Sequence, residues 1–177
     1  MNSEKTQLTR KAVSAPMRWV KDNLEYSFDD WSVLHFGEGK AFPDSAEMVR
    51  MGFAVTAYDP NSMDSSARNP ELIDPSLHTY DIGFSFYVFN TLNQYWREQA
   101  FNEMMRCCKR LIIAVRTDRV PGEKCQDGVI TKRLTFQTQL NKDQWLEYFT
   151  LISPVRSSVS LLHNGGHFAI IEVVGKR

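Results

Sequence analysis

Residues 31–60, WSVLHFGEGKAFPDSAEMVRMGFAVTAYDP, constrain the fold more than any other part of the chain. A β-type run from Ser32 to Phe36 leads into a loop with two glycines. A helical pattern follows, which Pro43 can begin and Gly52 can end, and a second β-type run covers Phe53 to Tyr58. Strand, loop, helix and strand within about thirty residues is the order and length of a right-handed βαβ unit. The segment therefore predicts two neighbouring parallel strands.

The same alternation continues further along the chain. Residues 80–89, YDIGFSFYVF, have the composition of a strand, and RLIIAVR (110–116) has that of a fully buried strand. Between them, Gln94 to Cys108 has apolar side chains at four-residue steps, beginning with Trp96, which predicts a helix with these side chains on its buried face. Strands that alternate with helices in this way predict an α/β fold, a mostly parallel sheet with helices on both faces.

The two ends of the chain have patterns of their own. Residues 1–12 are polar without an apolar period and predict a flexible tail, while 13–177 predict one domain that opens on a helix. Residues 59–76 and 121–128 are rich in turn-forming residues and predict loops.

The last third predicts a helix and a hairpin. NKDQWLEYF (141–149) predicts a helix capped by Asn141. Two β-type runs, Pro154 to Leu162 and His167 to Val174, are joined by His-Asn-Gly-Gly, which indicates a terminal antiparallel hairpin.

Composition excludes several classes of protein. Apolar residues make up 42% of the 177 residues and charged residues 24%, so the chain is neither disordered nor a coiled coil. Twenty-one Lys and Arg balance twenty-one Asp and Glu, which leaves no overall field to attract a polyanion. The three cysteines have no metal-ligand spacing, and we interpret them as reduced thiols. No apolar run approaches the roughly 20 residues of a membrane span. With no hydrophobic signal-peptide core at the N-terminus, we expect a cytoplasmic protein without membrane contact.

The strongest chemical signal is HFGEGKA, residues 35–41, at the expected junction of the first strand and its helix. Glycines at this position let the backbone approach a ligand. About twenty residues later, Asp59 ends the second strand, where a carboxylate can bond both hydroxyls of a ribose. The two signals together indicate a ligand that contains a nucleoside. They do not separate a nicotinamide cofactor from S-adenosylmethionine.

A family resemblance favours S-adenosylmethionine. The chain has Ala41 where a nicotinamide motif has its third glycine, and it ends in a predicted hairpin. In both features it resembles the Rossmann-like, seven-stranded methyltransferases. This resemblance implies seven strands in the sheet. Seven segments in order also resemble the DNA phosphorothioation-associated methyltransferases: SAPMRW (14–19), GEGK (37–40), YDP (58–60), YVFN (87–90), AVRTD (114–118), DGVITKRLTFQ (127–137) and GGHFAI (165–170). This resemblance implies S-adenosylmethionine as cofactor and a link to DNA modification.

The resemblance also implies a set of site residues and no metal. The residues expected to bind the cofactor are His35, Gly37, Glu38, Gly39, Asp59, Pro60, Phe86 and Tyr87. The expected catalytic residues are Tyr87, Asn90 and Asp118, and the expected substrate-binding residues are Arg18 and Arg116.

This chain departs from the family's usual motifs. His35 stands where methyltransferases usually have an acidic residue, and Glu38 with Lys40 changes the charge of the glycine loop. Glu38 is expected either to contact the methionine ammonium or to pair with Lys40. The sequence lacks an acidic or amide residue before Pro-Pro-Tyr, which is typical of amino-methylating DNA enzymes. It also lacks the Pro-Cys nucleophile of the enzymes that methylate a cytosine carbon. Both mechanisms are therefore disfavoured.

Three functions remain open from the sequence. The leading interpretation is an S-adenosylmethionine-dependent methyltransferase whose acceptor is a nucleic acid or a small molecule, with nucleic acid preferred. The second is an inactive methyltransferase-like protein that binds the cofactor and acts through a protein partner in a modification or defence system. The third is a nicotinamide-dependent oxidoreductase. A large substrate would be read by residues 59–76 or 119–137, since the chain has no room for a separate recognition domain.

Overall fold

The computed structural model describes residues 12–24, 31–39, 43–62 and 65–175. The predicted tail, apart from Ala12, and the loop residues Lys40 and Ala41 lie outside these ranges. The helices are α1 (Ala15–Asn23), α2 (Pro43–Arg50), α3 (Gln94–Cys107) and α4 (Lys142–Ile152), with short 3-10 helices at Pro70–Ile73 and Phe89–Thr91. The strands are β1 (Ser32–Phe36), β2 (Ala54–Tyr58), β3 (Tyr80–Phe86), β4 (Cys108–Arg116), β5 (Glu123–Cys125), β6 (Gly128–Ile130), β7 (Phe136–Thr138), β8 (Ser158–Asn164) and β9 (Phe168–Val174).

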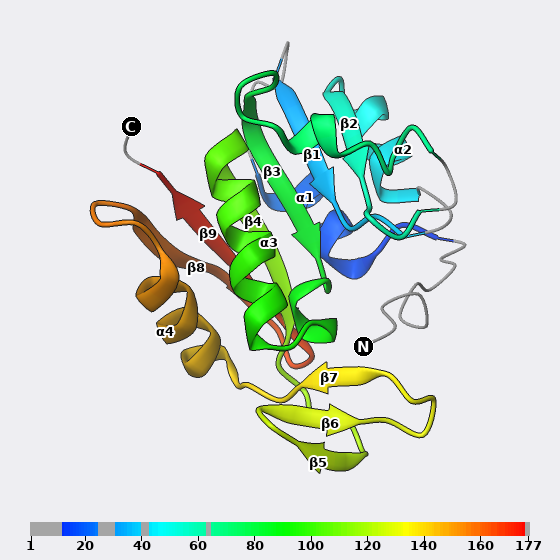
Figure 1. The fold of residues 1–177 in the computed structure, drawn as a ribbon, viewed down its shortest axis with the longest axis vertical. Coiled ribbons are helices and arrows are strands. Elements are labelled where there is room, and N and C mark those ends of the chain that lie inside the picture. Colours follow the sequence, from blue (N-terminus) through cyan, green and yellow to red (C-terminus); the bar gives the residue numbers. More distant parts are fainter. Residues whose placement is uncertain (1–11, 25–30, 40–42, 63–64, 176–177) are drawn as a thin grey trace.

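The main sheet has the strand order β2-β1-β3-β4-β9-β8 (Figure 1). The first four strands in this order are parallel, β9 is antiparallel to β4, and β8 is antiparallel to β9. The predicted unit β1-α2-β2, the mostly parallel sheet and the terminal hairpin are therefore confirmed. The resemblance implied seven strands, but the described residues form six in this sheet. Between Tyr58 and Tyr80 the described residues contain one 3-10 helix and no strand.

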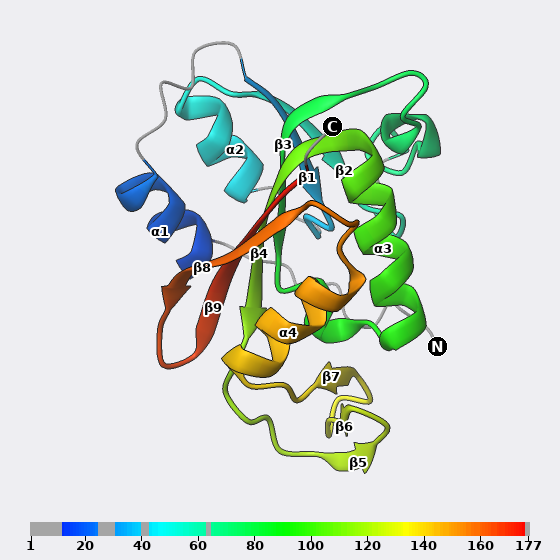
Figure 2. The same ribbon diagram turned by 90° about the vertical axis from the view of Figure 1, so that its left-hand side faces the viewer.

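Helices cover both faces of the sheet, as predicted. In Figure 2 the helices α1 and α2 lie on one side of the strands, and α3 and α4 lie on the other. Successive residues of β4 enter two separate buried clusters, since side chains alternate along a strand. Ile112 packs with Met17 of α1 and Met48 of α2, whereas Leu111 packs with Phe101 of α3 and Trp145 of α4.

The segment after β4 differs from the prediction. Residues 121–128 were expected to form a loop, but β5, β6 and β7 form a separate three-stranded antiparallel sheet that lies beyond the end of the main sheet (Figure 1). Each of these strands has three residues, too few for a period of two to be recognised in sequence. Their pairing depends on Phe136 and Val129, which are buried.

Local sequence signals explain the helix ends. Ser14 caps α1 through its side chain, and Asn141 forms a reciprocal capping box with Gln144 at the start of α4. Gly52, two residues after the end of α2, has a φ of +93° and lets the chain turn into β2. None of the helices in the described ranges is long and apolar enough to cross a bilayer.

Candidate functional site

A cavity of about 1330 Å³ opens at the carboxyl end of the parallel strands. The last residue of each of these four strands lines it: Phe36 of β1, Tyr58 of β2, Phe86 of β3 and Arg116 of β4. The strand order reverses between β1 and β3, because the chain moves outward from β1 to β2 and then returns to the other side of β1. Ligands of open α/β sheets bind at such a switch point.

The glycine loop forms one wall of the cavity. Gly37 and Gly39 both have positive φ, +76° and +82°, a conformation that favours glycine. The Gly37 amide donates to the Tyr58 carbonyl over 2.7 Å. A Cβ on Gly37 would lie 2.3 Å from a methyl carbon of Val88, so the loop packs directly on the segment after β3. The two glycines thus hold the loop close to the ends of β2 and β3.

Asp59 joins the second strand to this loop. Its Oδ2 accepts from the Gly39 amide over 2.9 Å, and its Oδ1 accepts from the Asn61 amide over 2.8 Å. The residue is buried and lines the cavity together with Pro60. The glycine loop and the carboxylate, twenty residues apart in the sequence, therefore meet on one wall, as the sequence predicted for a nucleoside site.

Glu38 turns toward the start of α2. Its Oε1 accepts from the Ser45 amide over 3.2 Å, and its Oε2 lies 3.7 Å from Nδ1 of the buried His35. The same His35 nitrogen lies 2.9 Å from the Ser45 hydroxyl. Within the described residues, Oε2 of Glu38 is buried and has no hydrogen-bond partner. Glu38 therefore caps α2, and it is also one of the residues that line the cavity.

Tyr87 has a backbone conformation that is rare for its residue type. Its φ is +65°, directly after β3, and its amide donates to the Ala114 carbonyl over 2.8 Å. Its ring meets the edge of Phe168 in the terminal hairpin, with ring centroids 6.2 Å apart. Both Tyr87 and Phe86 line the cavity. Strained backbone of this kind collects at functional sites, where the surrounding structure holds it.

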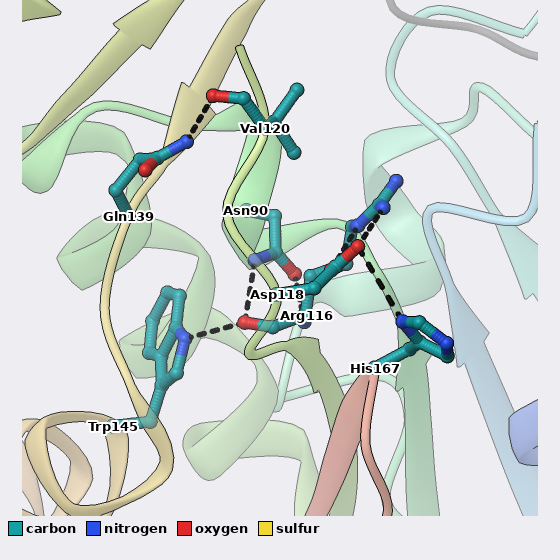
Figure 3. A network of polar contacts seen from close by, with 7 residues as sticks. All are labelled: Asn90, Arg116, Asp118, Val120, Gln139, Trp145 and His167. Carbon is teal, nitrogen blue, oxygen red and sulfur yellow. Dashed lines mark hydrogen bonds and ion pairs between the residues drawn. The ribbon is translucent and has the colours of Figure 1, made fainter.

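Asn90 lies behind the cavity wall and contacts the backbone of Arg116 (Figure 3). Its Oδ1 accepts from the Arg116 amide over 2.8 Å, and its Nδ2 donates to the Arg116 carbonyl over 3.3 Å. Trp145 Nε1 donates to the same carbonyl over 3.0 Å. The Asn90 side chain is 1% exposed and is not among the residues that line the cavity. The amide thus fixes the end of β4.

Arg116 and Asp118 form a bidentate ion pair, also visible in Figure 3. Arg116 Nε and Nη2 donate to the two Asp118 oxygens over 2.9 and 2.6 Å. His167 Nδ1 lies 3.8 Å from Asp118 Oδ2. The hydrogen bonds from Arg116 lower the pKa of Asp118, and those to Asp118 raise the pKa of Arg116. Arg116 lines the cavity and Asp118 does not.

One expected site residue lies away from the others. Arg18 is exposed, donates to the Val13 carbonyl over 2.6 Å and does not line the cavity. The start of the same helix reaches the site instead. Ser14 lines the cavity, and its amide donates to Asp44 Oδ1 over 2.7 Å. No local sequence pattern predicts this contact, because it joins residues thirty positions apart.

Two further parts of the cavity wall come from α3 and from the segment after β6. Trp96 was expected in the core, but it is 53% exposed and lines the cavity beside Glu103, whose pKa is raised by burial. The segment Thr131–Gln137, which consists of the turn after β6 and the first two residues of β7, contributes all seven of its residues. The earlier expectation that residues 119–137 could read a substrate agrees with this position. The described residues contain no group of His, Cys, Asp and Glu that could hold a metal ion.

The fold is similar to solved structures, although no protein-family model and no curated protein sequence matches the chain. A 1,6-didemethyltoxoflavin N1-methyltransferase from Burkholderia thailandensis, crystallised with S-adenosylhomocysteine, is 15% identical and has a TM-score of 0.65; the match covers 92% of this chain and 79% of the other. A protein described as a Zn-dependent alcohol dehydrogenase from Rhodobacter sphaeroides has 12% identity, a TM-score of 0.66 and coverage of 100% and 99%.

A third similar structure is a small RNA methyltransferase, with 12% identity and a TM-score of 0.63. The match covers 96% of this chain and 27% of that one. The chain therefore has a methyltransferase-type α/β fold. Identities this low describe the fold alone and leave the chemistry to be argued from the cavity.

Proposed function

We propose that this protein is an S-adenosylmethionine-dependent methyltransferase. The observation that carries the proposal is the hydrogen bond from the Gly39 amide to Asp59, which places the glycine loop and the strand-end carboxylate on one cavity wall at the switch point of the sheet. We propose that Asp59 accepts from the ribose hydroxyls and that the loop amides contact the nucleoside ligand.

The acidic residues that line the cavity fit the positive charges of the cofactor. Besides Asp59, the cavity is lined by the buried residues Asp44 and Glu38 and by Glu103 of α3. S-adenosylmethionine carries a sulfonium and an ammonium, and a methyl bound to a sulfonium is the group that it supplies. Glu38 is one of the carboxylates in this lining, and a carboxylate is suited to contact an ammonium. Of the two roles expected for Glu38, the ammonium contact is therefore the one we propose.

Residues at the ends of β3 and β4 would hold the acceptor. Tyr87 lines the cavity in a fixed, strained conformation, and we propose that it orients the nucleophile in line with the methyl group. We assign Asn90 to positioning, because its amide holds the Arg116 backbone. Asp118 is a weak base because its pKa is lowered by Arg116, so we expect the acceptor's proton to leave to solvent.

Nucleic acid is our proposed acceptor class. The supporting arguments are the resemblance to the phosphorothioation-associated methyltransferases and the likeness of the fold to a small RNA methyltransferase. Other similar structures include a methyltransferase bound to the small molecule 1,6-didemethyltoxoflavin. A small-molecule acceptor is therefore the competing outcome of an activity screen.

Calorimetric titration with S-adenosylhomocysteine, S-adenosylmethionine and NAD tests the cofactor. We expect micromolar binding of the first two and roughly tenfold to hundredfold weaker binding in Asp59→Ala, because hydrogen bonds to a charged group are lost. Asp59→Asn retains the shape and guards against misfolding. Asp74→Ala is the matched control: Asp74 accepts from the amide two residues later, as Asp59 does, but lies outside the cavity. Binding of NAD alone would instead support the oxidoreductase.

A second candidate function is a cofactor-binding protein without turnover. The side chains of Asn90 and Asp118, both expected to be catalytic, bind Arg116 within the protein, and this observation favours it. Such a protein would act through a partner. Release of S-adenosylhomocysteine in the presence of DNA, RNA or small acceptors would exclude this candidate, whereas tight binding without turnover on any acceptor would favour it.

A further inference from the structure

The cavity has a second wall with a different chemistry from the cofactor wall. The segment Thr131–Gln137, the turn after β6 with the start of β7, has the sequence TKRLTFQ, which carries two cations and no acid. Lys132 and Arg133 are exposed and line the cavity. Their side chains have no hydrogen-bond or ion-pair partner in the described part of the chain, whereas the cation of Arg116 is paired with Asp118. These two residues are therefore positive charges available to a ligand.

The turn is held in one conformation by its two threonines. The Thr131 amide donates to the Thr135 carbonyl over 2.9 Å, and the Leu134 amide donates to the Thr131 carbonyl over 2.8 Å. The hydroxyls of Thr131 and Thr135 lie 2.8 Å apart. Leu134 has a φ of +58°. The backbone that carries Lys132 and Arg133 is thus fixed, which reduces the entropy lost when a ligand binds.

An aromatic side chain lines the same cavity from α3. Trp96 is 53% exposed and meets the Tyr95 ring edge-on, with centroids 5.0 Å apart. It belongs to neither buried cluster of the core. Trp96 therefore presents an aromatic ring to the cavity that the core does not cover.

We propose that Trp96, Lys132 and Arg133 form the acceptor subsite for a single-stranded nucleic acid. One base stacks on Trp96, and the phosphates contact the two cations. This inference rests on the proposed methyltransferase function and names its acceptor. Stacking on an aromatic ring combined with cations along the backbone is how proteins bind single strands. A duplex keeps its bases stacked within the helix, and this chain of zero net charge has no broad field to hold one.

Fluorescence anisotropy with a labelled 12-nucleotide single strand, as DNA and as RNA, tests the subsite. The protein is saturated with S-adenosylhomocysteine and also measured without it. We expect about tenfold weaker binding in Trp96→Ala and recovery in Trp96→Phe, which keeps an aromatic face. In Lys132→Ala/Arg133→Ala the slope of log affinity against log salt should fall by about 1.4, since each single-strand phosphate contact contributes about 0.7.

The matched control is Arg119→Ala/Lys124→Ala. These exposed cations belong to the same segment after β4 but do not line the cavity, so the variant removes the same charge elsewhere. Equal weakening by the control, or tighter binding of the matching duplex, would overturn the subsite. An affinity for free AMP equal to that for the 12-nucleotide strand would overturn the single strand as acceptor and would indicate a mononucleotide. Cofactor binding without any nucleotide binding would overturn this inference and leave the methyltransferase proposal standing; failure to bind the cofactor would remove the latter independently.

Discussion

At the scale of single residues, Gly37 couples the stability of the glycine loop to its function. A side chain there meets Val88 at 2.3 Å and must adopt a φ of +76°. We expect Gly37→Ala to lower the free energy of unfolding by about 2–4 kcal/mol and to abolish S-adenosylhomocysteine binding. Urea unfolding and calorimetry measure the two effects. Gly166→Ala is the control, with nothing within 4 Å of its added Cβ, and should change stability by less than about 0.5 kcal/mol.

Asp81, at the end of the sheet opposite the cavity, makes the stability of the folded protein sensitive to acid. It accepts from the amide and hydroxyl of Ser32 in β1 and from Lys109 in β4, the latter over 2.7 Å. The bond from Lys109 and those from Ser32 lower its pKa from 3.8 to about 2.

Because this pKa is depressed in the folded state, its stabilisation is complete above pH 4 and is lost as the pH falls toward 2. We expect Asp81→Asn to cost about 1 kcal/mol at pH 7, after allowance for solvent screening, and to flatten the stability profile between pH 4 and 2. Thermal unfolding across this range measures it. An unchanged profile in the variant would contradict the assignment, and Asp143→Asn, at a 79% exposed side chain, serves as control.

At the scale of elements, Arg97 joins the three-stranded sheet to α3. Its side chain is 1% exposed, donates to Thr138 Oγ1 over 2.6 Å and pairs with Asp127. Its guanidinium carbon lies 5.7 Å from the centre of the Trp145 ring and 5.2 Å from that of Tyr148. Arg97 is therefore a buried cation that helps to attach the sheet carrying the proposed acceptor turn.

We expect Arg97→Met to destabilise the protein by about 3 kcal/mol, because it leaves Asp127 without its partner. Limited proteolysis should then cut within residues 117–140 first. Arg106→Met, at an exposed arginine of the same helix, should leave both the unfolding midpoint and the cleavage pattern unchanged. If this segment resists proteolysis in Arg97→Met as well as it does in the unsubstituted protein, its attachment does not require the buried cation.

At the scale of the whole molecule, stability should decline from the middle of the main sheet to its edges. β3 and β4 each pair with neighbours on both sides, and five consecutive residues of β4, Leu111–Val115, are fully buried. β2 and β8 are edge strands, and β5 to β7 form a small sheet of their own. Elements with fewer buried contacts open locally at lower free energy.

Native-state hydrogen exchange is expected to follow this order. Amides of β3 and β4 should exchange last, those of β8 earlier, and those of β5 to β7 earliest. Addition of S-adenosylhomocysteine should slow exchange at residues 37–39 and 59–61 and leave β8 unchanged. Slower exchange in β5 to β7 than in β4 would contradict the order.

The sequence alone determined the α/β class, the unit β1-α2-β2, the capped helix α4, the terminal hairpin and the pairing of the glycine loop with Asp59. These features depend on periodicity, caps and turn residues, which act over a few neighbouring positions. They also follow from the rule that parallel strands end at one edge of the sheet.

Only the tertiary structure decided which side chains face the cavity. Trp96 shares a helical period with Ala100 and Met104, yet lies at the exposed start of α3, where the core no longer covers it. Asn90 was expected at the end of a strand, as a site residue would be, but it lies in the 3-10 helix after β3 and its amide binds the Arg116 backbone. The basic turn reaches the site through pairing of three-residue strands and a buried ion pair. Such contacts join residues that are distant along the chain, so local sequence patterns do not predict them.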